Sequence, residues 1–201
     1  MTINRAVFLD RDGTINVERE FLHRPEEFRF IPGAVQAVRL LNEAGFRVIV
    51  VSNQSGIARG FFDGAAVIRL HRYMDSELAR SGASIDAYYF CPHHPEYSSD
   101  DDGKKCRCRK PLPGMLLKAT AEFSLDLPAS FIIGDKLADV QAGLNAGCRA
   151  ILVRTGYGAG EESRLPADIP VYDDLLTAVR AIVEETGNQA EGGRELIDLQ
   201  P

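Results

Sequence analysis

The chain has 201 residues, of which 45% are hydrophobic and 26% are charged, and its formal net charge is −6. This composition predicts one soluble globular domain, and no apolar run approaches the roughly 20 residues of a membrane-spanning helix. The acidic balance argues against a general nucleic-acid binder, which needs a basic surface. The N-terminus enters an apolar run without a secretory signal segment, so we expect a cytoplasmic protein in a reducing compartment.

Apolar runs alternate with amphipathic segments along the chain. Strands are expected at residues 6–9, 48–51, 85–90, 131–133 and 150–153. Helices are expected at residues 34–44, 64–80, 113–123, 137–146 and 173–185. This alternation predicts an α/β fold, a three-layer α/β/α Rossmann-like parallel sheet with helices on both faces.

We expect a single domain over residues 1–186, followed by a C-terminal tail. Residues 15–30 mix charges and aromatics without clear periodicity and are expected to form a surface flap. Residues 91–112 are too long for an ordinary loop between a strand and a helix. Residues 187–201 place three glycines among polar residues, which predicts a flexible C-terminal tail.

Polar side chains follow four of the expected strands. Asp10 and Asp12 come directly after the first, and because strand side chains alternate, both point to the same side of the backbone. The carboxyl ends of parallel strands share one edge of a sheet, so residues far apart in sequence can converge there. Singly, each could be a helix cap or a surface residue, as Asp135 and Asp139 could cap the following helix. The residues expected at this edge are Asp10, Asp12, Ser52, Arg109, Lys110 and Asp135.

Three of the four cysteines lie in one segment together with a histidine. A Cys-x-His pair and a Cys-x-Cys pair offer three thiolates and one imidazole, the ligand set of a closed structural zinc site in a loop spanning residues 91–108. A disulfide is disfavoured in a reducing compartment. We expect His94 to lie next to the zinc ligands without binding the metal, or to lie at the surface. Cys148 is expected to be a small buried hydrophobic residue. The expected zinc ligands are Cys91, His93, Cys106 and Cys108.

Four ordered motifs resemble those of the haloacid dehalogenase superfamily. They are Asp10-x-Asp12-Gly13-Thr14, Ser52-Asn53, Lys110-Pro111 and Gly134-Asp135-x-x-x-Asp139. Within this HAD superfamily the chain is similar to the D,D-heptose 1,7-bisphosphate phosphatases, from about residue 6 to residue 156. The most telling matches are the segments Asp10–Asn16, Asn53–Gly60, Cys91–Pro95 and Cys106–Pro111. The related histidinol-phosphate phosphatases share most of them.

The resemblance implies a Mg²⁺-dependent phosphatase. Asp10 would attack phosphorus and become an aspartyl-phosphate, and Asp12 would protonate the leaving oxygen and then deprotonate water. Mg²⁺ would bind the side chains of Asp10 and Asp135 and the backbone carbonyl of Asp12. A zinc with four protein ligands has no open position, so its expected role is to hold the loop that carries Arg109 and Lys110.

Further cations and loops complete the expected site. Lys110 and Ser52 would hold the phosphoryl oxygens, Lys136 would add positive charge, and Asp139 would orient one of the two lysines. The intervals between the motifs leave no room for a cap domain, so specificity is expected from residues 18–24, residues 53–60 and the zinc loop. Arg59 and Arg109 would meet a second phosphate or hydroxyl groups, although Arg59 could equally be a surface residue. The residues expected to contact substrate are Asp10, Arg11, Asp12, Glu18, Arg19, Glu20, Phe21, Ser52, Asn53, Gln54, Ser55, Arg59, Arg109, Lys110 and Lys136.

The substrate implied by the resemblance is D-glycero-D-manno-heptose 1,7-bisphosphate. Loss of its C7 phosphate would give heptose 1-phosphate for ADP- or GDP-heptose and lipopolysaccharide core biosynthesis. Histidinol phosphate is the alternative, because Glu18 and Glu20 could attract its cationic amine. A third hypothesis is a nucleic-acid contact or DNA 3′-phosphatase built on the basic run 104–110, which lacks the interleaved aromatics that stack on bases. We expect a monomer that acts on a small molecule, without nucleic-acid or membrane partners.

Overall fold

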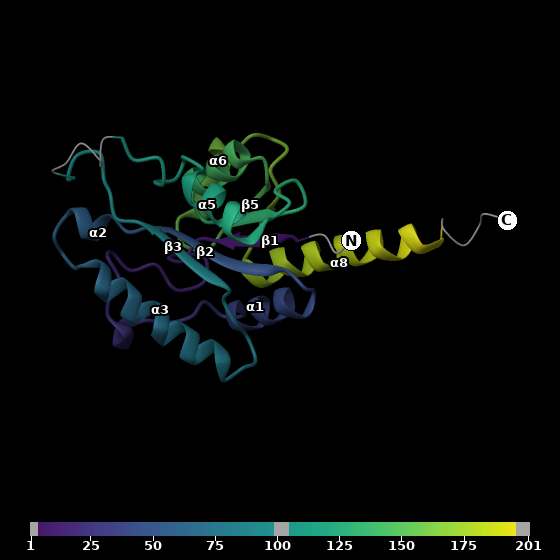
Figure 1. Cartoon of the computed structure of the whole chain (residues 1–201), viewed down its shortest axis with the longest axis horizontal. Coiled ribbons are helices and arrows are strands. Elements are labelled where there is room, and N and C mark those ends of the chain that lie inside the picture. Colours follow the sequence, from purple (N-terminus) through teal and green to yellow (C-terminus); the bar gives the residue numbers. More distant parts are fainter. Residues whose placement is uncertain (1–3, 99–104, 196–201) are drawn as a thin grey trace.

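The computed structural model of the protein describes residues 4–98 and 105–195, and its centre is a six-stranded sheet (Figure 1). The strand order is β3-β2-β1-β4-β5-β6, and every neighbouring pair is parallel. The strands are β1 (Ala6–Leu9), β2 (Arg47–Asn53), β3 (Ala87–Cys91), β4 (Phe131–Gly134), β5 (Arg149–Val153) and β6 (Val171–Tyr172). The expected α/β class is confirmed. The edge strand β6 was not predicted, because a strand of two residues is too short to show a periodic pattern in the sequence.

Helices cover both faces of this sheet. The helices are α1 (Ala34–Glu43), α2 (Ser55–Ala58), α3 (Gly64–Ala79), α5 (Gly114–Phe123), α6 (Leu137–Ala146), α7 (Gly158–Glu161) and α8 (Leu175–Glu195), with 3₁₀ turns η1 (Pro25–Glu27) and η2 (Glu162–Arg164). In Figure 1, α1, α3 and α8 lie on one face, and α5 and α6 lie on the other. All five predicted helices are present. In the described part of the chain, no helix is both long and apolar enough to cross a membrane.

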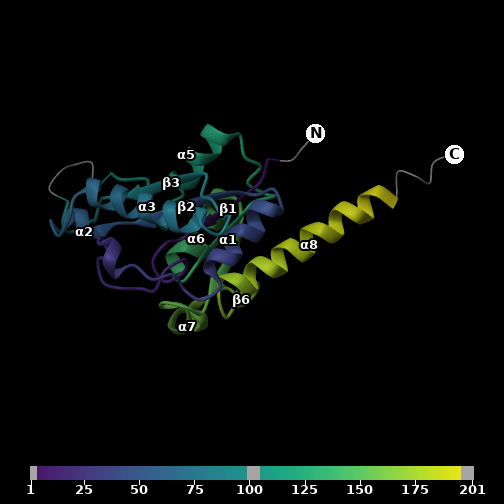
Figure 2. The ribbon, with the colours of Figure 1, turned by 90° about the horizontal axis from the view of Figure 1, so that it is seen from below.

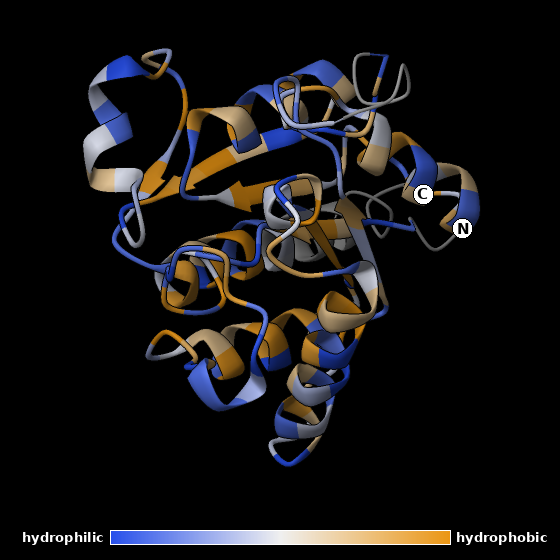
Figure 3. Ribbon diagram, turned by 90° about the vertical axis from the view of Figure 1, so that its left-hand side faces the viewer, coloured by the Kyte–Doolittle hydropathy of each residue, from blue (hydrophilic) through white to orange (hydrophobic). Residues whose placement is uncertain are grey.

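The apolar runs form strands because both of their faces are covered. Val7 and Leu9 pack into the core under α1, α3 and α8, whereas Ala6 and Phe8 pack into the core under α5 and α6. A parallel strand buried on both faces is therefore apolar throughout rather than alternating. Figure 3 shows the hydrophobic strands between helices whose colours mix hydrophobic and hydrophilic residues.

Two sequence predictions are wrong in part. The segment 15–30 is not simply a surface flap, because Ile15, Leu22 and Phe28 are at most 3% exposed and anchor it to the core. The expected flexible tail is helical over residues 187–195, because α8 continues to Glu195 and extends away from the sheet (Figure 2). The rest of the expected tail, 196–201, lies outside the described residues.

The strand order places a crevice beside β1. The chain proceeds from β1 to β2 and β3 on one side, and from β4 to β5 and β6 on the other. The reversal falls between β1 and β4, where Leu9 is aligned with Ile133. Ligands of open α/β sheets bind outside the carboxyl ends of the strands at such a reversal. Asp10 follows β1 at this point, and Asp135 follows β4.

Candidate active site

Asp10 lies in a buried cluster of charges at the end of β1. Its Oδ1 accepts a hydrogen bond from the backbone N–H of Arg11 and lies 2.8 Å from Nζ of Lys110. The same Nζ lies 2.6 Å from Oδ1 of Asp139 and donates to the carbonyl of Val51. Burial alone would lower the pKa of Lys110, but the two carboxylates outweigh it and raise this pKa. Lys110 is thus a fixed cation beside Asp10, and Asp139 orients it.

Asp135, at the end of β4, brings an oxygen that lacks a partner. Its Oδ2 accepts a hydrogen bond from the backbone N–H of Tyr157 at 2.9 Å. Its Oδ1 is buried and accepts no hydrogen bond from the described residues, and the nearest cation, Nζ of Lys136, is 3.6 Å away. Burial and the Asp10 carboxylate raise the pKa of Asp135 to about 7. They also raise the pKa of Asp139 to about 6.

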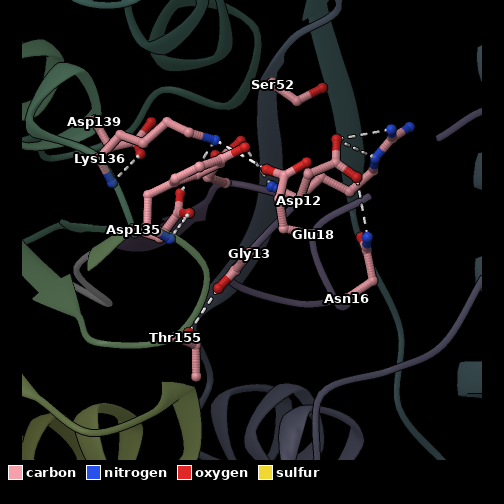
Figure 4. Close-up of polar contacts among 12 residues, drawn as sticks. Asp12, Gly13, Asn16, Glu18, Ser52, Asp135, Lys136, Asp139 and Thr155 are labelled. Atoms are coloured by element: carbon pink, nitrogen blue, oxygen red, sulfur yellow. Dashed lines mark hydrogen bonds and ion pairs between the residues drawn. The ribbon is translucent and has the colours of Figure 1, made fainter. Parts of the chain in front are cut away.

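These carboxylates fit a divalent cation. One oxygen from each of Asp10, Asp135 and Asp139 lies within 4.8 Å of the others. Mg²⁺ takes oxygen ligands, and a cation would compensate the unpartnered Oδ1 of Asp135. Both oxygens of Asp139 are engaged, Oδ1 by Nζ of Lys110 and Oδ2 by the backbone N–H of Lys136, whereas Lys110 contacts only Oδ1 of Asp10, so Asp10 and Asp135 are the better candidates for side-chain ligands. Figure 4 shows Asp135, Lys136 and Asp139 together on one side of the site.

Glycines make room for Asp135. Gly13 has φ +86°, and a Cβ added to Gly13 or Gly156 would lie 2.1 Å from Oδ2 of Asp135. Thr155 Oγ1 donates to the carbonyl of Gly13 at 2.6 Å (Figure 4), which ties the loop after β5 to the loop after β1. Sequence reasoning missed Thr155, Gly156 and Tyr157, because they contribute backbone and space rather than a charged motif.

Asp12 lies on the other side of Asp10 and is 17% exposed at its side chain. Its carboxylate accepts hydrogen bonds from Arg11, Asn16 and Gln54. Burial alone would raise the pKa of Asp12, but the Arg11 charge and these three donors lower it. The Arg11 side chain, which is expected from the sequence to contact substrate, is completely buried and does not line the cavity.

A cavity of about 310 Å³ opens above these carboxylates. Eleven of the residues expected to contact substrate line it: Asp10, Asp12, Glu18, Arg19, Glu20, Phe21, Asn53, Gln54, Ser55, Lys110 and Lys136. The other six lining residues are not among the expected substrate contacts, although Leu22 and Gly56 lie in the segments 18–24 and 53–60 that are expected to give specificity. The six are Leu22, Gly56, Phe62, Ala138, Asp139 and Tyr157.

Three more expected substrate contacts lie outside this lining. Ser52 is buried, and its Oγ accepts a hydrogen bond from Nε2 of Gln54. The Arg59 guanidinium stacks over the ring of Tyr97, 3.9 Å from its centroid. The Nη1 of Arg109 donates to Ser55 Oγ and to the carbonyl of His93, each at 3.0 Å. Without a ligand, all three side chains contact residues of the neighbouring loops.

An ion pair crosses the mouth of the cavity. Lys136 Nζ lies 3.1 Å from Oε2 of Glu18, so the segment before Leu22 is tied to the end of β4. Burial raises the pKa of Glu18, the charges of Asp12 and Asp10 add to this effect, and Lys136 opposes it. Glu18 is therefore engaged by a cation of the protein itself.

The Cys/His cluster forms a second centre. Its four ligand atoms lie within 4.8 Å of one another, with Cys91 Sγ 3.5 Å from Cys106 Sγ and 3.7 Å from His93 Nδ1. A tetrahedral zinc with Zn–S bonds of about 2.3 Å holds its ligand atoms about 3.5–3.8 Å apart, so the cluster can hold zinc. Residues 99–104 of the expected zinc loop lie outside the described residues.

The Cys/His cluster is connected to Lys110 through the backbone. The side-chain amide of Asn53 donates to the carbonyl of Lys110 at 3.0 Å and accepts from its N–H at 3.1 Å. Asn53 ends β2, and Lys110 follows Cys108 by two residues. The end of the cysteine loop is thus fixed to the sheet at the residue whose side chain contacts Asp10.

Comparisons with known proteins show which family this chain resembles. A family model described as HAD-hydrolase-like matches residues 107–178. The D-glycero-beta-D-manno-heptose-1,7-bisphosphate 7-phosphatase of Yersinia pestis is 46% identical over 180 residues, which cover 88% of this chain and 95% of that protein. The chain belongs to this family of HAD-like phosphatases. The enzyme of the same name from Escherichia coli K12 is 47% identical over 90% of this chain and 94% of its own length.

Solved structures of the phosphatase family agree in fold. A D,D-heptose 1,7-bisphosphate phosphatase from B. bronchiseptica, solved with magnesium and phosphate, matches with a TM-score of 0.82 and 38% identity, covering 90% of this chain and 99% of that one. A HAD-like phosphatase from Mesorhizobium loti matches with a TM-score of 0.79 and 35% identity, covering 91% and 87%. The resemblance read from the motifs is confirmed.

Proposed function

We propose that this protein is a Mg²⁺-dependent phosphatase that removes the 7-phosphate of D-glycero-β-D-manno-heptose 1,7-bisphosphate. The observation that carries the chemistry is the Asp10 carboxylate, which lies against Lys110 beside the unpartnered oxygen of Asp135. The family relatives supply the substrate, because their names specify the 7-phosphatase reaction and the beta anomer. The cavity volume is within the range of small-molecule sites.

The reaction divides into two displacements. In the first, a carboxylate oxygen of Asp10 bonds to phosphorus, the bond from phosphorus to the sugar oxygen breaks, and Asp12 gives a proton to that oxygen. In the second, water attacks phosphorus, Asp12 takes a proton from the water, and the Asp10 carboxylate is released with inorganic phosphate. The positive charge of Lys110 stabilises both attacks, because it faces the carboxylate that gains and loses the phosphoryl group.

The metal site and the remaining cations serve charge neutralisation. Mg²⁺, when bound by Asp10, Asp135 and the backbone carbonyl of Asp12, supplies the positive charge that lets a carboxylate approach a phosphate dianion. Lys136 lines the same cavity and adds a cation that Glu18 keeps in place. Arg19, also in the lining, is suited to the 1-phosphate or to a sugar hydroxyl.

The zinc cluster has a structural role in this proposal. Cys91, His93, Cys106 and Cys108 fill all four positions of a tetrahedral zinc, which leaves none for water or substrate. Keeping three thiols available for zinc fits the reducing conditions of the cytoplasm, where we place the protein. We also propose a monomer that acts in heptose activation for lipopolysaccharide.

Two other substrates remain as outcomes of a direct test. Histidinol phosphate requires an acidic subsite, but of the two candidate glutamates Glu18 is paired with Lys136, which leaves Glu20 in the cavity lining. A DNA 3′-phosphate requires an accessible basic surface, but Lys110, which ends the basic run, is 3% exposed and bound to two carboxylates. Neither alternative is therefore favoured.

The test is to measure kcat/KM for both anomers of heptose 1,7-bisphosphate, histidinol phosphate and a DNA 3′-phosphate. We expect the beta anomer to have the highest kcat/KM and Asp10→Asn to abolish turnover of every substrate. A higher kcat/KM for histidinol phosphate or DNA would overturn the substrate assignment. Full activity of Asp10→Asn would overturn the mechanism as well.

A further inference from the structure

Arg11 is buried in a way that stability alone does not account for. Its side chain is completely inaccessible, and among the ion pairs of the described residues its partner is Asp12, 2.8 Å away. Nη1 of Arg11 is buried without a hydrogen-bond partner. Removing a guanidinium from water is unfavourable, and an incompletely bonded ion pair is a poor way to stabilise a core.

The donors around Asp12 divide between its two oxygens. Oδ2 accepts from Nε and Nη2 of Arg11, at 3.1 and 2.8 Å, and from Nε2 of Gln54 at 3.3 Å. Oδ1 accepts from Nδ2 of Asn16 at 2.9 Å, which Figure 4 shows reaching the carboxylate from below. Because donors approach both oxygens from different directions, the carboxylate plane is fixed.

Separate segments supply these donors. Arg11, Asp12 and Asn16 share one tight turn, in which the Arg11 carbonyl accepts from the N–H groups of Ile15 and Asn16. Nη2 of Arg11 also donates to the carbonyl of Leu22, which is one of the residues that line the cavity. Gln54 comes from the loop after β2 and is itself held by Ser52. The orientation of Asp12 is therefore set by three parts of the fold.

We propose that Arg11, with Gln54 and Asn16, is a positioning residue that aims the Asp12 carboxylate at the leaving-group oxygen. The Arg11 side chain is buried away from the cavity and acts on Asp12 directly and through Gln54, whose Oε1 accepts from Nη2 of Arg11 at 3.3 Å. The proposal rests on the proposed function, since it assumes that Asp12 transfers the proton to the departing alcohol. It assigns to the first loop the task of fixing the acid relative to Asp10.

The leaving group distinguishes this role from a structural one. An alkyl ester such as heptose 1,7-bisphosphate releases a basic alkoxide that needs the proton from Asp12, whereas p-nitrophenyl phosphate releases a stable anion that does not. The ratio of kcat/KM for the two esters therefore reports on proton delivery. Loss of folded protein lowers both values together and leaves the ratio unchanged.

We expect Arg11→Met to lower kcat/KM for the heptose ester by about 100-fold and for p-nitrophenyl phosphate by less than about fivefold. Gln54→Met should change the ratio in the same direction by about tenfold, and it serves as the test if Arg11→Met does not fold. Arg149→Met is the matched control, because it removes a bidentate pair with Glu185 at the opposite end of β5. Its ratio should equal that of the wild type.

A double variant decides whether Arg11 acts through Asp12. In an Asp12→Asn background, Arg11→Met should leave the ratio of the two kcat/KM values unchanged, because the acid has already been removed. An additional change in the ratio, or a parallel fall for both esters in Arg11→Met alone, would overturn the proposal. Glycerol 3-phosphate serves as a second alkyl ester, so that a failure of the heptose assignment remains separate from a failure of this one.

Discussion

The carboxylate cluster and the cysteine cluster are both suited to metals, but they are built differently. Asp10, Asp135 and Asp139 are buried at strand ends, and one oxygen of Asp135 has no hydrogen-bond partner. The cysteine cluster lies mostly half-buried at a strand end and in a loop, and its ligand atoms already surround one another. The first arrangement leaves room for a reacting group, whereas the second is closed.

The difference teaches how a loop can influence chemistry without taking part in it. The cysteine cluster contacts no residue of the carboxylate cluster directly through its ligands. The contacts that join the two clusters are those of Arg109, which donates to the His93 carbonyl and to Ser55 Oγ, and those between the Lys110 backbone and Asn53. Positioning catalysis depends on such fixed geometry, so disorder in the loop should lower the rate.

The largest effect is expected in the carboxylate cluster. Asp10→Asn removes the attacking carboxylate oxygen and should lower kcat by at least about 1,000-fold, because no other residue of the site replaces Asp10 as the nucleophile. Steady-state kinetics report on the carboxylate cluster, and zinc content measured by atomic absorption reports on the cysteine cluster. Zinc content should stay at the wild-type value, and loss of zinc from this variant would show that the two clusters are not separate.

A smaller effect is expected in the cysteine cluster. Cys108→Ser should lose zinc and lower kcat/KM by about 10- to 100-fold, because the loop that carries Lys110 is no longer fixed. Cys148→Ala is the matched control, since Cys148 is a buried cysteine outside the cluster. Normal turnover by a zinc-free Cys108→Ser enzyme would refute the coupling between the clusters.

The connection itself can be cut with both clusters intact. Asn53→Ala removes two hydrogen bonds to the Lys110 backbone and should lower kcat/KM by about tenfold, each bond contributing about 1 kcal/mol. Zinc content and ligand spectra with Co²⁺ in place of zinc should be unchanged. If zinc is lost together with activity, Asn53 supports the cluster rather than its link to Lys110.

A pH effect on stability is expected from His71, a buried residue of α3. Burial, with a further contribution from the Arg11 charge, lowers the pKa of His71 to about 3. Between this value and the ordinary 6.5, the unfolded chain binds a proton that the folded chain does not, so stability falls as the pH drops below 6.5. The loss at pH 5 should be about 2 kcal/mol.

Urea unfolding at pH 7 and pH 5 measures this loss. His71→Phe should be less sensitive to acid by about the same amount, while it keeps an aromatic ring stacked on Tyr88. Equal losses of stability in the variant and the wild type would show that other groups cause the acid sensitivity.

The sheet edge was predictable because each functional residue follows an apolar run. Asp10, Ser52 and Asp135 sit at strand ends whose positions the runs define, and parallel strands bring their carboxyl ends together. The Cys-x-His and Cys-x-Cys spacings likewise identify the second cluster without reference to the fold. In these cases the residue spacing in the sequence determines the position of the backbone from which each side chain extends.

Spacing does not determine where a long side chain ends. Arg11 and Arg59 are expected from the sequence to face substrate, but Arg11 turns inward to Asp12 and Arg59 stacks on Tyr97. The glycines at residues 187–193 indicate a chain end, yet α8 continues through them at a cost of about 1 kcal/mol per glycine relative to alanine. The first turns of α8 are packed in the core beside α1, through Leu175, Ala178, Val179 and Ile182.

The most direct test of the account is to locate the phosphoryl group during turnover. Asp12→Asn should form the aspartyl-phosphate from p-nitrophenyl phosphate but hydrolyse it slowly, because no base activates the water. Rapid acid quench followed by peptide mass spectrometry should find one added phosphoryl group on the peptide that contains Asp10. A phosphoryl group on another residue, or none while nitrophenol is released in a burst, would contradict the account.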